Sequence, residues 1–295
     1  MKKKNIPLGD RMKSYEKEYD RIISDDENIV VRLDGHKFSK FTKGLIKPFD
    51  EVIYKAFEET CFDIMEEFNP STIYYQSDEI TVIFPSYKDK TVDDRKSSKH
   101  KLQKKIKEDW QHIYGGRTQK LVSLISGYCT MRFNYHFKKY AIEQIAMQDD
   151  TEYTRNLSKK MGNAWFDARA YGANDEETFN SVLWRYRDCI KNSKSMVAYA
   201  YCSHKSLLNM NGDERVQFCK ETTGHDWNEV SPKFKYGTFF KRAEYIKNTE
   251  HGKVVRTKCI PYFMSPEEFG FSTENVDFIL CKKLPLNALK YTKEK

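Results

Sequence analysis

Four residues in the first third of this chain have the types and spacing that metal-assisted phosphate chemistry uses. Each lies at the end of a short strand-like run, and together they are Asp34, Gly35, Asp78 and Glu79. Two carboxylates brought face to face repel each other, and a pair of Mg²⁺ ions roughly 3.5–4 Å apart relieves that repulsion while activating an attacking hydroxyl and stabilising a leaving phosphate. The spacing alone fits equally an Asp-Gly turn and a hairpin tip, so its meaning depends on the elements that position these residues.

The first strand and the helix after it are clear in the sequence. Residues 28–33 are short, apolar and rich in β-branched side chains, which is typical of a buried strand. The helix is predicted to begin after Asp50, an N-cap residue, because apolar side chains recur at helical spacing over residues 53–68. The Asn-Pro pair at 69–70 ends it.

The elements that follow complete a βαββαβ order. They are a strand, a strand, a helix and a strand at 73–76, 80–84, about 117–137 and 165–170. This order is typical of a split βαβ arrangement on a single antiparallel sheet, in which the first strand is central and lies next to the hairpin. We therefore expect Asp34 and Asp78 to face each other.

Two further regions do not belong to that plan. Residues 86–116 form a basic insertion, and over 88–120 eleven Lys and Arg stand against five Asp and Glu. Such a segment suits either a phosphate backbone or a solvated helix face. From residue 174 the pattern is mostly helical, with a weaker pair of strand-like runs at 236–242 and 253–259.

The composition excludes several broad classes of protein. Of the 295 residues, 51 are Lys or Arg and 43 are Asp or Glu, and the resulting net charge of +8 favours polyanionic partners. The longest uncharged stretch near the middle, 121–131, is far shorter than the roughly 20 residues of a membrane helix, and no signal peptide is predicted. The seven cysteines have no CxxC spacing, which predicts reduced thiols and a cytoplasmic location.

Several motifs together resemble the tRNA(His) guanylyltransferase superfamily, whose members are reverse (3′–5′) polymerases. In chain order they are RLDGHKFSKF at 32–41, KPFD at 47–50, YQSDE at 75–79, FDAR at 166–169, LWRYRD at 183–188 and SHKSL at 203–207. Their order and spacing, over roughly residues 6–245, are specific, whereas each motif alone is modest. The resemblance implies a polymerase-type palm as the catalytic domain at 1–172 and a fingers-like region that contacts RNA at 173–295.

The resemblance also implies a role for individual residues. Asp34 and Asp78 match the metal-binding pair, with the carbonyl of Gly35 as a further ligand and Glu79 as a third catalytic carboxylate. The residues that match nucleotide-binding positions are His36, Lys37, Phe38, Ser39, Lys47, Asp50, Ser77, Arg117 and Lys120. Structural interpretations remain open for Asp50 as a helix cap, Lys47 as a solvated loop residue, and Arg117 with Lys120 as an exposed helix face.

The implied reaction consists of two phosphoryl transfers. The 5′-phosphate of an RNA attacks the α-phosphorus of ATP and releases pyrophosphate, and the 3′-hydroxyl of an incoming nucleotide, often GTP, then displaces AMP. The implied cofactor is Mg²⁺, as two ions, and the implied assembly is a homotetramer. A palm-type nucleotidyl cyclase or forward polymerase would use the same two-aspartate hairpin, but the flanking motifs match the reverse polymerases.

One stretch departs from the eukaryotic members of the superfamily. Where they carry HINNLYN, residues 189–195 read CIKNSKS, and the template-dependent relatives lack the motif too. The resemblance therefore favours templated repair of tRNA 5′ ends. Non-templated addition of guanosine to tRNA(His) is the alternative, and a non-catalytic RNA-binding protein is the second alternative.

Three residues of the C-terminal region are candidates for RNA binding, namely Arg185, His204 and Lys205. Arg185 fits equally an ion pair with Asp188, three residues along the same helix. Trp184 and Tyr186 recur at helical spacing and are predicted to lie in the core rather than to stack on bases.

Overall fold

The fold is a mixed sheet of seven strands with helices on both faces, seen in a computed structural model that describes residues 6–86, 111–250 and 252–284. The strands are β1 (Asn28–Gly35), β2 (Thr72–Gln76), β3 (Glu79–Phe84), β4 (Phe166–Ala173), β5 (Thr238–Thr249), β6 (Gly252–Tyr262) and β7 (Lys283–Leu284). The long helices are α3 (Glu51–Phe68), α5 (Thr118–Ala146) and α7 (Asp175–Tyr201). The shorter ones are α1 (Leu8–Glu18), α2 (Phe38–Phe41), α6 (Glu152–Lys160), α8 (Gly212–Thr223), α9 (Pro232–Tyr236) and α10 (Thr273–Leu280), with 3₁₀ turns at Ile113–Gly116 and Trp227–Glu229.

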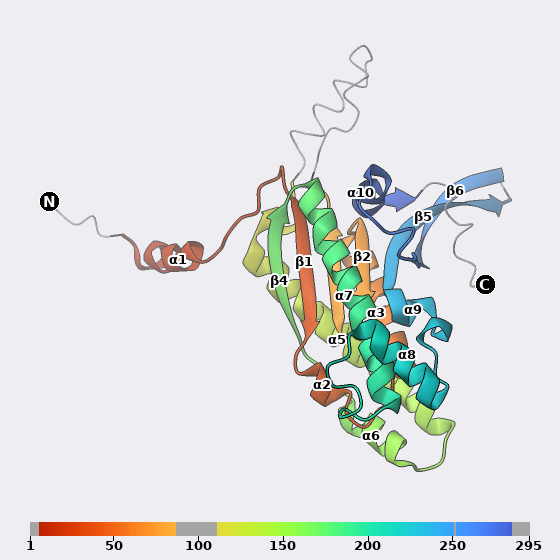
Figure 1. The fold of residues 1–295 in the computed structure, drawn as a ribbon. Coiled ribbons are helices and arrows are strands. Elements are labelled where there is room, and N and C mark those ends of the chain that lie inside the picture. The colour runs from red at the N-terminus through yellow and green to blue at the C-terminus, as the bar shows by residue number, and fades with distance from the viewer. Residues whose placement is uncertain (1–5, 87–110, 251, 285–295) are drawn as a thin grey trace.

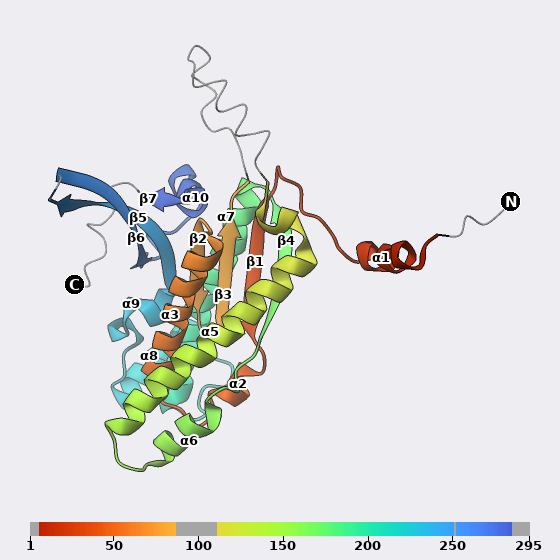
Figure 2. The same ribbon diagram turned by 180° about the vertical axis from the view of Figure 1, so that it is seen from behind.

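The strand order β4-β1-β3-β2 confirms the βαββαβ prediction. β1 is central and pairs antiparallel with both β3 and β4, in the register that sets Val31 beside Val82 and Asp34 beside Glu79. Helices α3 and α5 cover one face of the sheet, and α7 lies across the other (Figure 1, Figure 2). The apolar side chains of β1 that alternate toward α3 and α5 are fully buried, as a period of two requires.

The two long helices behind the sheet begin and end for identifiable reasons. α3 begins after Asp50, whose carboxylate accepts hydrogen bonds from the backbone N–H groups of Val52 (2.9 Å) and Ile53 (3.3 Å), and it ends at Asn69 in the left-handed region (φ 50°). Both limits confirm the sequence prediction. α5 continues to Ala146, past the predicted end at residue 137, because Ala141 still faces the core.

The C-terminal region adds both helices and strands to the sheet. α7 packs its apolar stripe, including Phe179 and Tyr186, against the face of the sheet opposite to α3. β5 pairs with β2, with Phe240 beside Ile73, and the β5–β6 hairpin extends beyond the sheet (Figure 1). The sheet is therefore continuous across the predicted boundary at 172/173, and the division into a palm and a fingers-like region stays a prediction about function.

Three sequence predictions concern features outside the site. The basic insertion at 86–116 falls mostly on residues 87–110, which lie outside the described residues. All seven cysteines are described and all are free thiols, as predicted. In the described ranges no helix is long and apolar enough to cross a membrane.

Candidate active site

Asp34 and Asp78 meet where β1 ends and the β2–β3 hairpin turns. The backbone N–H of Gly35 donates to the carbonyl of Asp78 (3.0 Å), which fixes the two acidic residues next to each other. The hairpin turns tightly because Ser77 adopts a left-handed conformation (φ 52°). Burial raises the pKa of Asp78, and the charge of Asp34 raises it further. The prediction that Asp34 and Asp78 lie next to each other is thereby confirmed.

The turn after β1 is shaped by Gly35. A Cβ atom at this position would lie 2.3 Å from the ring of Phe38, which is buried among other phenylalanines behind the sheet. His36 and Lys37 are exposed at the turn, Lys37 in the left-handed region (φ 52°), and α2 begins at Phe38. This turn and the packing of Phe38 behind the sheet therefore both depend on a residue without a side chain at position 35.

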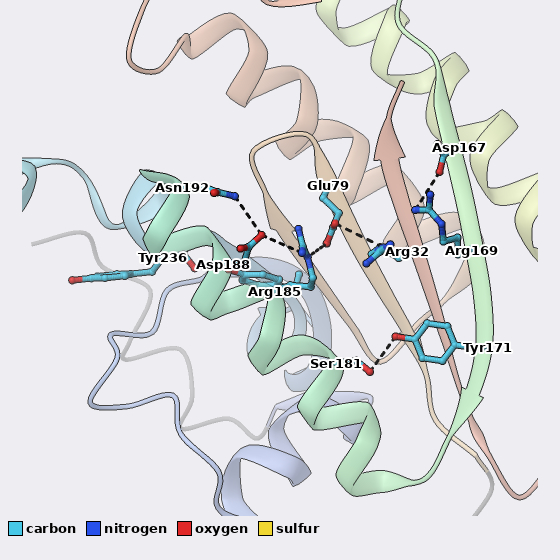
Figure 3. Close-up of polar contacts among 11 residues, drawn as sticks. Arg32, Glu79, Asp167, Arg169, Tyr171, Ser181, Arg185, Asp188, Asn192 and Tyr236 are labelled. Carbon is cyan, nitrogen blue, oxygen red and sulfur yellow. Dashed lines mark hydrogen bonds and ion pairs between the residues drawn. The ribbon is translucent and has the colours of Figure 1, made fainter. Parts of the chain in front are cut away.

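Glu79 lies beside this pair but is already engaged. Arg185 of α7 donates from Nε to Oε1 of Glu79 (2.5 Å), and Nε of Arg32 lies 3.8 Å from the other carboxylate oxygen. Arg185 also pairs with Asp188 (3.1 Å), which confirms the ion-pair interpretation, and Asp188 in turn accepts from the amide of Asn192 (3.4 Å). Figure 3 shows this chain of contacts running from β1 across β3 to α7. Burial raises the pKa of Glu79, and the two guanidinium groups oppose that rise.

The layer around Glu79 has spare hydrogen-bonding capacity. Buried side-chain atoms without a hydrogen-bond partner in the described structure include Arg32 Nε, Gln76 Oε1 and Thr81 Oγ1. The strand register sets Gln76 beside Glu79 and Thr81 beside Arg32, so all three surround the same carboxylate. Buried polar groups are nearly always paired, and exceptions concentrate at functional sites.

A cavity of about 480 Å³ opens beside Asp78. Six of the predicted site residues line it together, namely Phe38, Ser39, Lys47, Asp50, Ser77 and Asp78. Its opposite wall comes from α7 and α9 and includes Asn192, Ser193, Tyr199, Lys233 and Phe234. Asn192 belongs both to this wall and to the chain of contacts that ends at Glu79. A cavity of this size fits a nucleotide-sized ligand.

Asp50 has a structural task in addition to any role in the cavity. Its carboxylate caps α3 and also accepts from the backbone N–H of Ile46 (3.0 Å), and Tyr153 bonds to it from α6. The cap interpretation is thus confirmed, while the nucleotide-binding role stays a prediction. Lys47 is exposed at the cavity wall.

Arg117 and Lys120 lie at the other end of the sheet. Arg117 pairs with Ile22 in a β-bridge and forms an ion pair with Asp20, both just before β1 begins. The six residue-to-residue steps along β1 from Asn28 to Asp34 span about 20 Å. Within one chain, the structure does not bring these two cations to the carboxylate pair.

The donor set at the carboxylate pair suits a hard cation. Asp34 and Asp78 offer carboxylate oxygens and Gly35 a backbone carbonyl, and Mg²⁺ commonly binds through one or two carboxylates together with substrate phosphates. Burial is the main cause of the raised pKa of Asp78 and the charge of Asp34 is the second, and a cation bound beside the two residues would oppose both effects. In the described ranges no group of three His, Cys, Asp or Glu side chains could hold a metal ion. A cation here thus needs further ligands such as phosphate oxygens.

Comparison with known proteins decides the family. Residues 9–179 match the family described as tRNA(His) guanylyltransferase (Thg1). The chain belongs to this family. An uncharacterized protein of Acanthamoeba polyphaga mimivirus is 34% identical over 255 residues, which cover 83% of this chain and 82% of the viral protein. The superfamily resemblance and the nucleotidyltransferase class are thereby confirmed.

Solved structures of Thg1 proteins have a similar fold. A bacterial Thg1-like protein in complex with ATP is 28% identical, with a TM-score of 0.63 over 84% of this chain and 91% of that one. A bacterial Thg1-like protein in complex with GTP is 27% identical, with a TM-score of 0.60 over 86% and 91%. The Saccharomyces cerevisiae tRNA(His) guanylyltransferase, 18% identical, matches with a TM-score of 0.57 over 82% and 94% and supports the fold alone.

The structure of this Thg1 protein also places the C-terminal candidates. His204 stacks on Tyr199 (5.5 Å between centroids), a residue of the cavity wall, and Lys205 is exposed next to it. Tyr186 is buried as predicted, but the prediction for Trp184 is wrong because its side chain is 55% exposed. The guanidinium groups of Arg185 and Arg32 lie over the indole ring, at 4.8 Å and 5.4 Å from its centroid, so Trp184 packs on cations at the surface and not in the apolar core.

Sequence reasoning missed the far wall of the cavity. Lys233 reaches across to Glu51 (3.0 Å) and lies over the ring of Tyr54 at 4.3 Å, and Phe234 stacks on Phe49 at 4.4 Å. The only sequence signal was the basic and aromatic run at 233–236, which has no motif of its own. α9 is brought to the cavity by tertiary packing alone.

Proposed function

We propose that this Thg1-family protein is a 3′–5′ nucleotidyltransferase that repairs tRNA 5′ ends by templated addition. The observation that carries the proposal is a nucleotide-sized cavity with Asp78 in its wall, so that a bound triphosphate lies beside the carboxylate pair. The relatives that bind ATP and GTP support it. The departure at residues 189–195 from the eukaryotic HINNLYN pattern favours repair over guanylylation of tRNA(His).

The reaction divides into activation and addition. In activation, an oxygen of the RNA 5′-phosphate bonds to the α-phosphorus of ATP and pyrophosphate leaves. In addition, the 3′-hydroxyl oxygen of the incoming nucleotide bonds to the activated 5′-phosphorus and AMP leaves. The exposed ammonium group of Lys47 offsets phosphate charge, and the backbone at Phe38 and Ser39 positions the triphosphate.

Asp34, Asp78 and the Gly35 carbonyl would hold Mg²⁺ in this scheme. The ion supplies charge neutralisation and lowers the pKa of the attacking hydroxyl. Glu79, tied to Arg185 and Arg32, keeps the hairpin side of the pair in place. No side chain needs to act as a strong base.

His204 and Lys205, at the cavity rim, are proposed to contact the tRNA near its reacting end. A cytoplasmic location is likewise a proposal, supported by the seven free thiols.

The test is nucleotide addition to two substrates, a 5′-monophosphorylated tRNA(His) and a 5′-truncated tRNA, each with ATP, all four NTPs and Mg²⁺. Growth of only the truncated tRNA, abolished in Asp78→Asn, is the expected result. The control is Asp213→Asn, an exposed carboxylate of α8 whose loss leaves the site intact.

Other outcomes of this assay have definite meanings. A single guanosine added only to tRNA(His) replaces repair by the guanylylation alternative. No extension of either tRNA, with RNA still bound equally by wild type and Asp78→Asn, rejects the catalytic proposal and leaves the RNA-binding alternative.

A further inference from the structure

Two cysteines meet where α8 packs against the end of α7 (Figure 1). Cys202 directly follows α7, and Cys219 lies in the third turn of α8. Both belong to one apolar cluster, in which Cys219 is fully buried and Cys202 is partly exposed. The thiol of Cys202 is a hydrogen-bond partner of the thiol of Cys219, and its sulfur also lies 3.8 Å from Oγ1 of Thr222, three residues further along α8. Tertiary packing thus brings together two thiols from different elements.

The other five cysteines have different surroundings. Three of them are buried away from any oxidant in solution, namely Cys61, Cys129 and Cys189. The remaining two are partly exposed, and of these Cys281 donates to the carbonyl of Phe278 while Cys259 lies on β6. The pair at the end of α7 therefore combines an accessible thiol with a second thiol in contact with it, which is the arrangement that redox-sensitive cysteines use.

The same corner of the structure forms part of the cavity wall. Ser195 and Tyr199 of α7 line the cavity, and Arg215 of α8 contacts both. Its guanidinium lies over the ring of Tyr199 at 5.3 Å, and its Nη1 donates to Oγ of Ser195 (3.3 Å). His204, two residues after Cys202, stacks on the same tyrosine ring. A shift of α8 against the end of α7 would therefore move the cavity wall and a residue proposed to contact tRNA.

We propose that Cys202 and Cys219 are a redox-sensitive pair whose disulfide regulates the cavity beside them. The oxidant is hydrogen peroxide. First the thiolate sulfur of Cys202 bonds to one peroxide oxygen, the O–O bond breaks, and the departing hydroxide takes up the proton that the thiol released. The sulfur of Cys219 then bonds to the sulfur of this sulfenic acid, the S–O bond breaks, and the hydroxyl group leaves as water with the proton of Cys219. The two thiols lose two electrons, and the peroxide is reduced to two molecules of water.

Burial decides which thiol reacts first. Cys202 is partly exposed, whereas burial raises the pKa of Cys219 and keeps that thiol protonated until its neighbour is oxidised. A disulfide of this kind is compatible with a reducing compartment, where disulfides are usually transient.

The disulfide also has a geometric consequence. Its sulfurs are about 2.05 Å apart, closer than two thiols in hydrogen-bond contact, so closing the bond draws the end of α7 toward α8. Catalytic geometry tolerates a displacement of about 1 Å poorly, so we expect the oxidised form to add nucleotides more slowly. This consequence rests on the proposed function, whereas the disulfide itself does not.

The first test treats the reduced full chain with stoichiometric hydrogen peroxide, denatures it and labels the remaining thiols with iodoacetamide. Mass spectrometry should find five of the seven cysteines labelled and one cross-link between the peptides of Cys202 and Cys219. Dithiothreitol should restore seven labelled cysteines. Cys202→Ser should abolish the cross-link, and the matched control Cys281→Ser, which removes another partly exposed thiol, should leave it unchanged. Seven labelled cysteines after peroxide, or a cross-link between other cysteines, overturns the proposed pair.

The second test measures nucleotide addition to the 5′-truncated tRNA by the oxidised and the reduced chain. Oxidation should slow addition about threefold or more, dithiothreitol should restore the rate, and Cys202→Ser should be insensitive to peroxide. A cross-linked chain that adds nucleotides at the reduced rate overturns the regulation of the cavity. If the reduced wild type adds no nucleotide, the proposed function and its regulation are both rejected, while the cross-link still decides whether the two thiols form a redox pair.

Discussion

Replacing Arg185 by Met tests whether α7 holds the acidic hairpin in place. Glu79 is buried, with 5% of its surface exposed, and its shortest contact is the 2.5 Å hydrogen bond from Arg185. Removing one partner of a buried ion pair leaves an uncompensated charge and costs about 3–5 kcal/mol. Because Arg32 remains 3.8 Å from the carboxylate, we expect a loss near the lower limit, about 3 kcal/mol at neutral pH.

The pH dependence of this loss has a definite sign. Burial raises the pKa of Glu79 in the folded protein, and Arg185 is the largest opposing influence, so the variant raises that pKa further. A carboxyl group whose pKa is raised by folding destabilises the folded state as the pH rises from its unfolded pKa through its folded pKa. The deficit in Arg185→Met is therefore smaller at about pH 5 than at about pH 7.5, since protonation of Glu79 relieves the buried charge.

The assay is urea unfolding of both proteins at these two pH values. Arg187→Met, an exposed arginine of the same helix, is the matched control and should change the free energy of unfolding by less than about 0.5 kcal/mol. In a Glu79→Gln background the cost of Arg185→Met should fall by more than about 1 kcal/mol. A deficit below about 0.5 kcal/mol, or one of the same size at both pH values, refutes the reasoning.

Three further predictions concern single positions. Gly35→Ala should lower the free energy of unfolding, measured by chemical denaturation, by about 1–3 kcal/mol, because the added Cβ meets the buried ring of Phe38. Unchanged stability would show that the ring moves freely. Asp50→Ala should lower the free energy of unfolding by about 1–2 kcal/mol, because α3 loses its N-cap. Asp50→Asn should keep most of that stability, because an asparagine side chain also caps a helix. An Asp50→Asn variant that is stable but no longer adds nucleotides would therefore reveal a catalytic role for the carboxylate. Burial lowers the pKa of Lys241 to about 8, so the ammonium group loses its proton at a lower pH in the folded protein than in the unfolded chain. Between about pH 8 and 10 the wild type should therefore gain stability relative to Lys241→Met, and parallel profiles would contradict this.

The sequence predicted the carboxylate pair because local patterns fixed each part of it. The β-branched run of β1, the N-cap at Asp50 and the three-residue gap in the hairpin are short-range signals, and the antiparallel order then left one place for Asp34 and Asp78 to meet. The C-terminal end of α5 was harder to predict, because the burial of the residues after 137 depends on what packs against them.

The contacts of Arg185 and Trp184 could not be resolved in the same way. A helical period places both residues on α7 but does not say that a polar layer of the sheet lies beneath them, which decides that Arg185 pairs with Glu79 and that the indole remains exposed. Arg117 shows the same limit, since its role depends on the segment before β1 that lies beside it.

The sequence by itself therefore determined the elements of the βαββαβ core and the residues of the acidic hairpin, because each element is recorded in a local pattern, and the order of these elements is typical of a single arrangement of their four strands. Only the tertiary structure decided the far wall of the cavity and the partners of Glu79. Those features join segments from distant parts of the sequence, and no local periodicity records which surfaces will pack together.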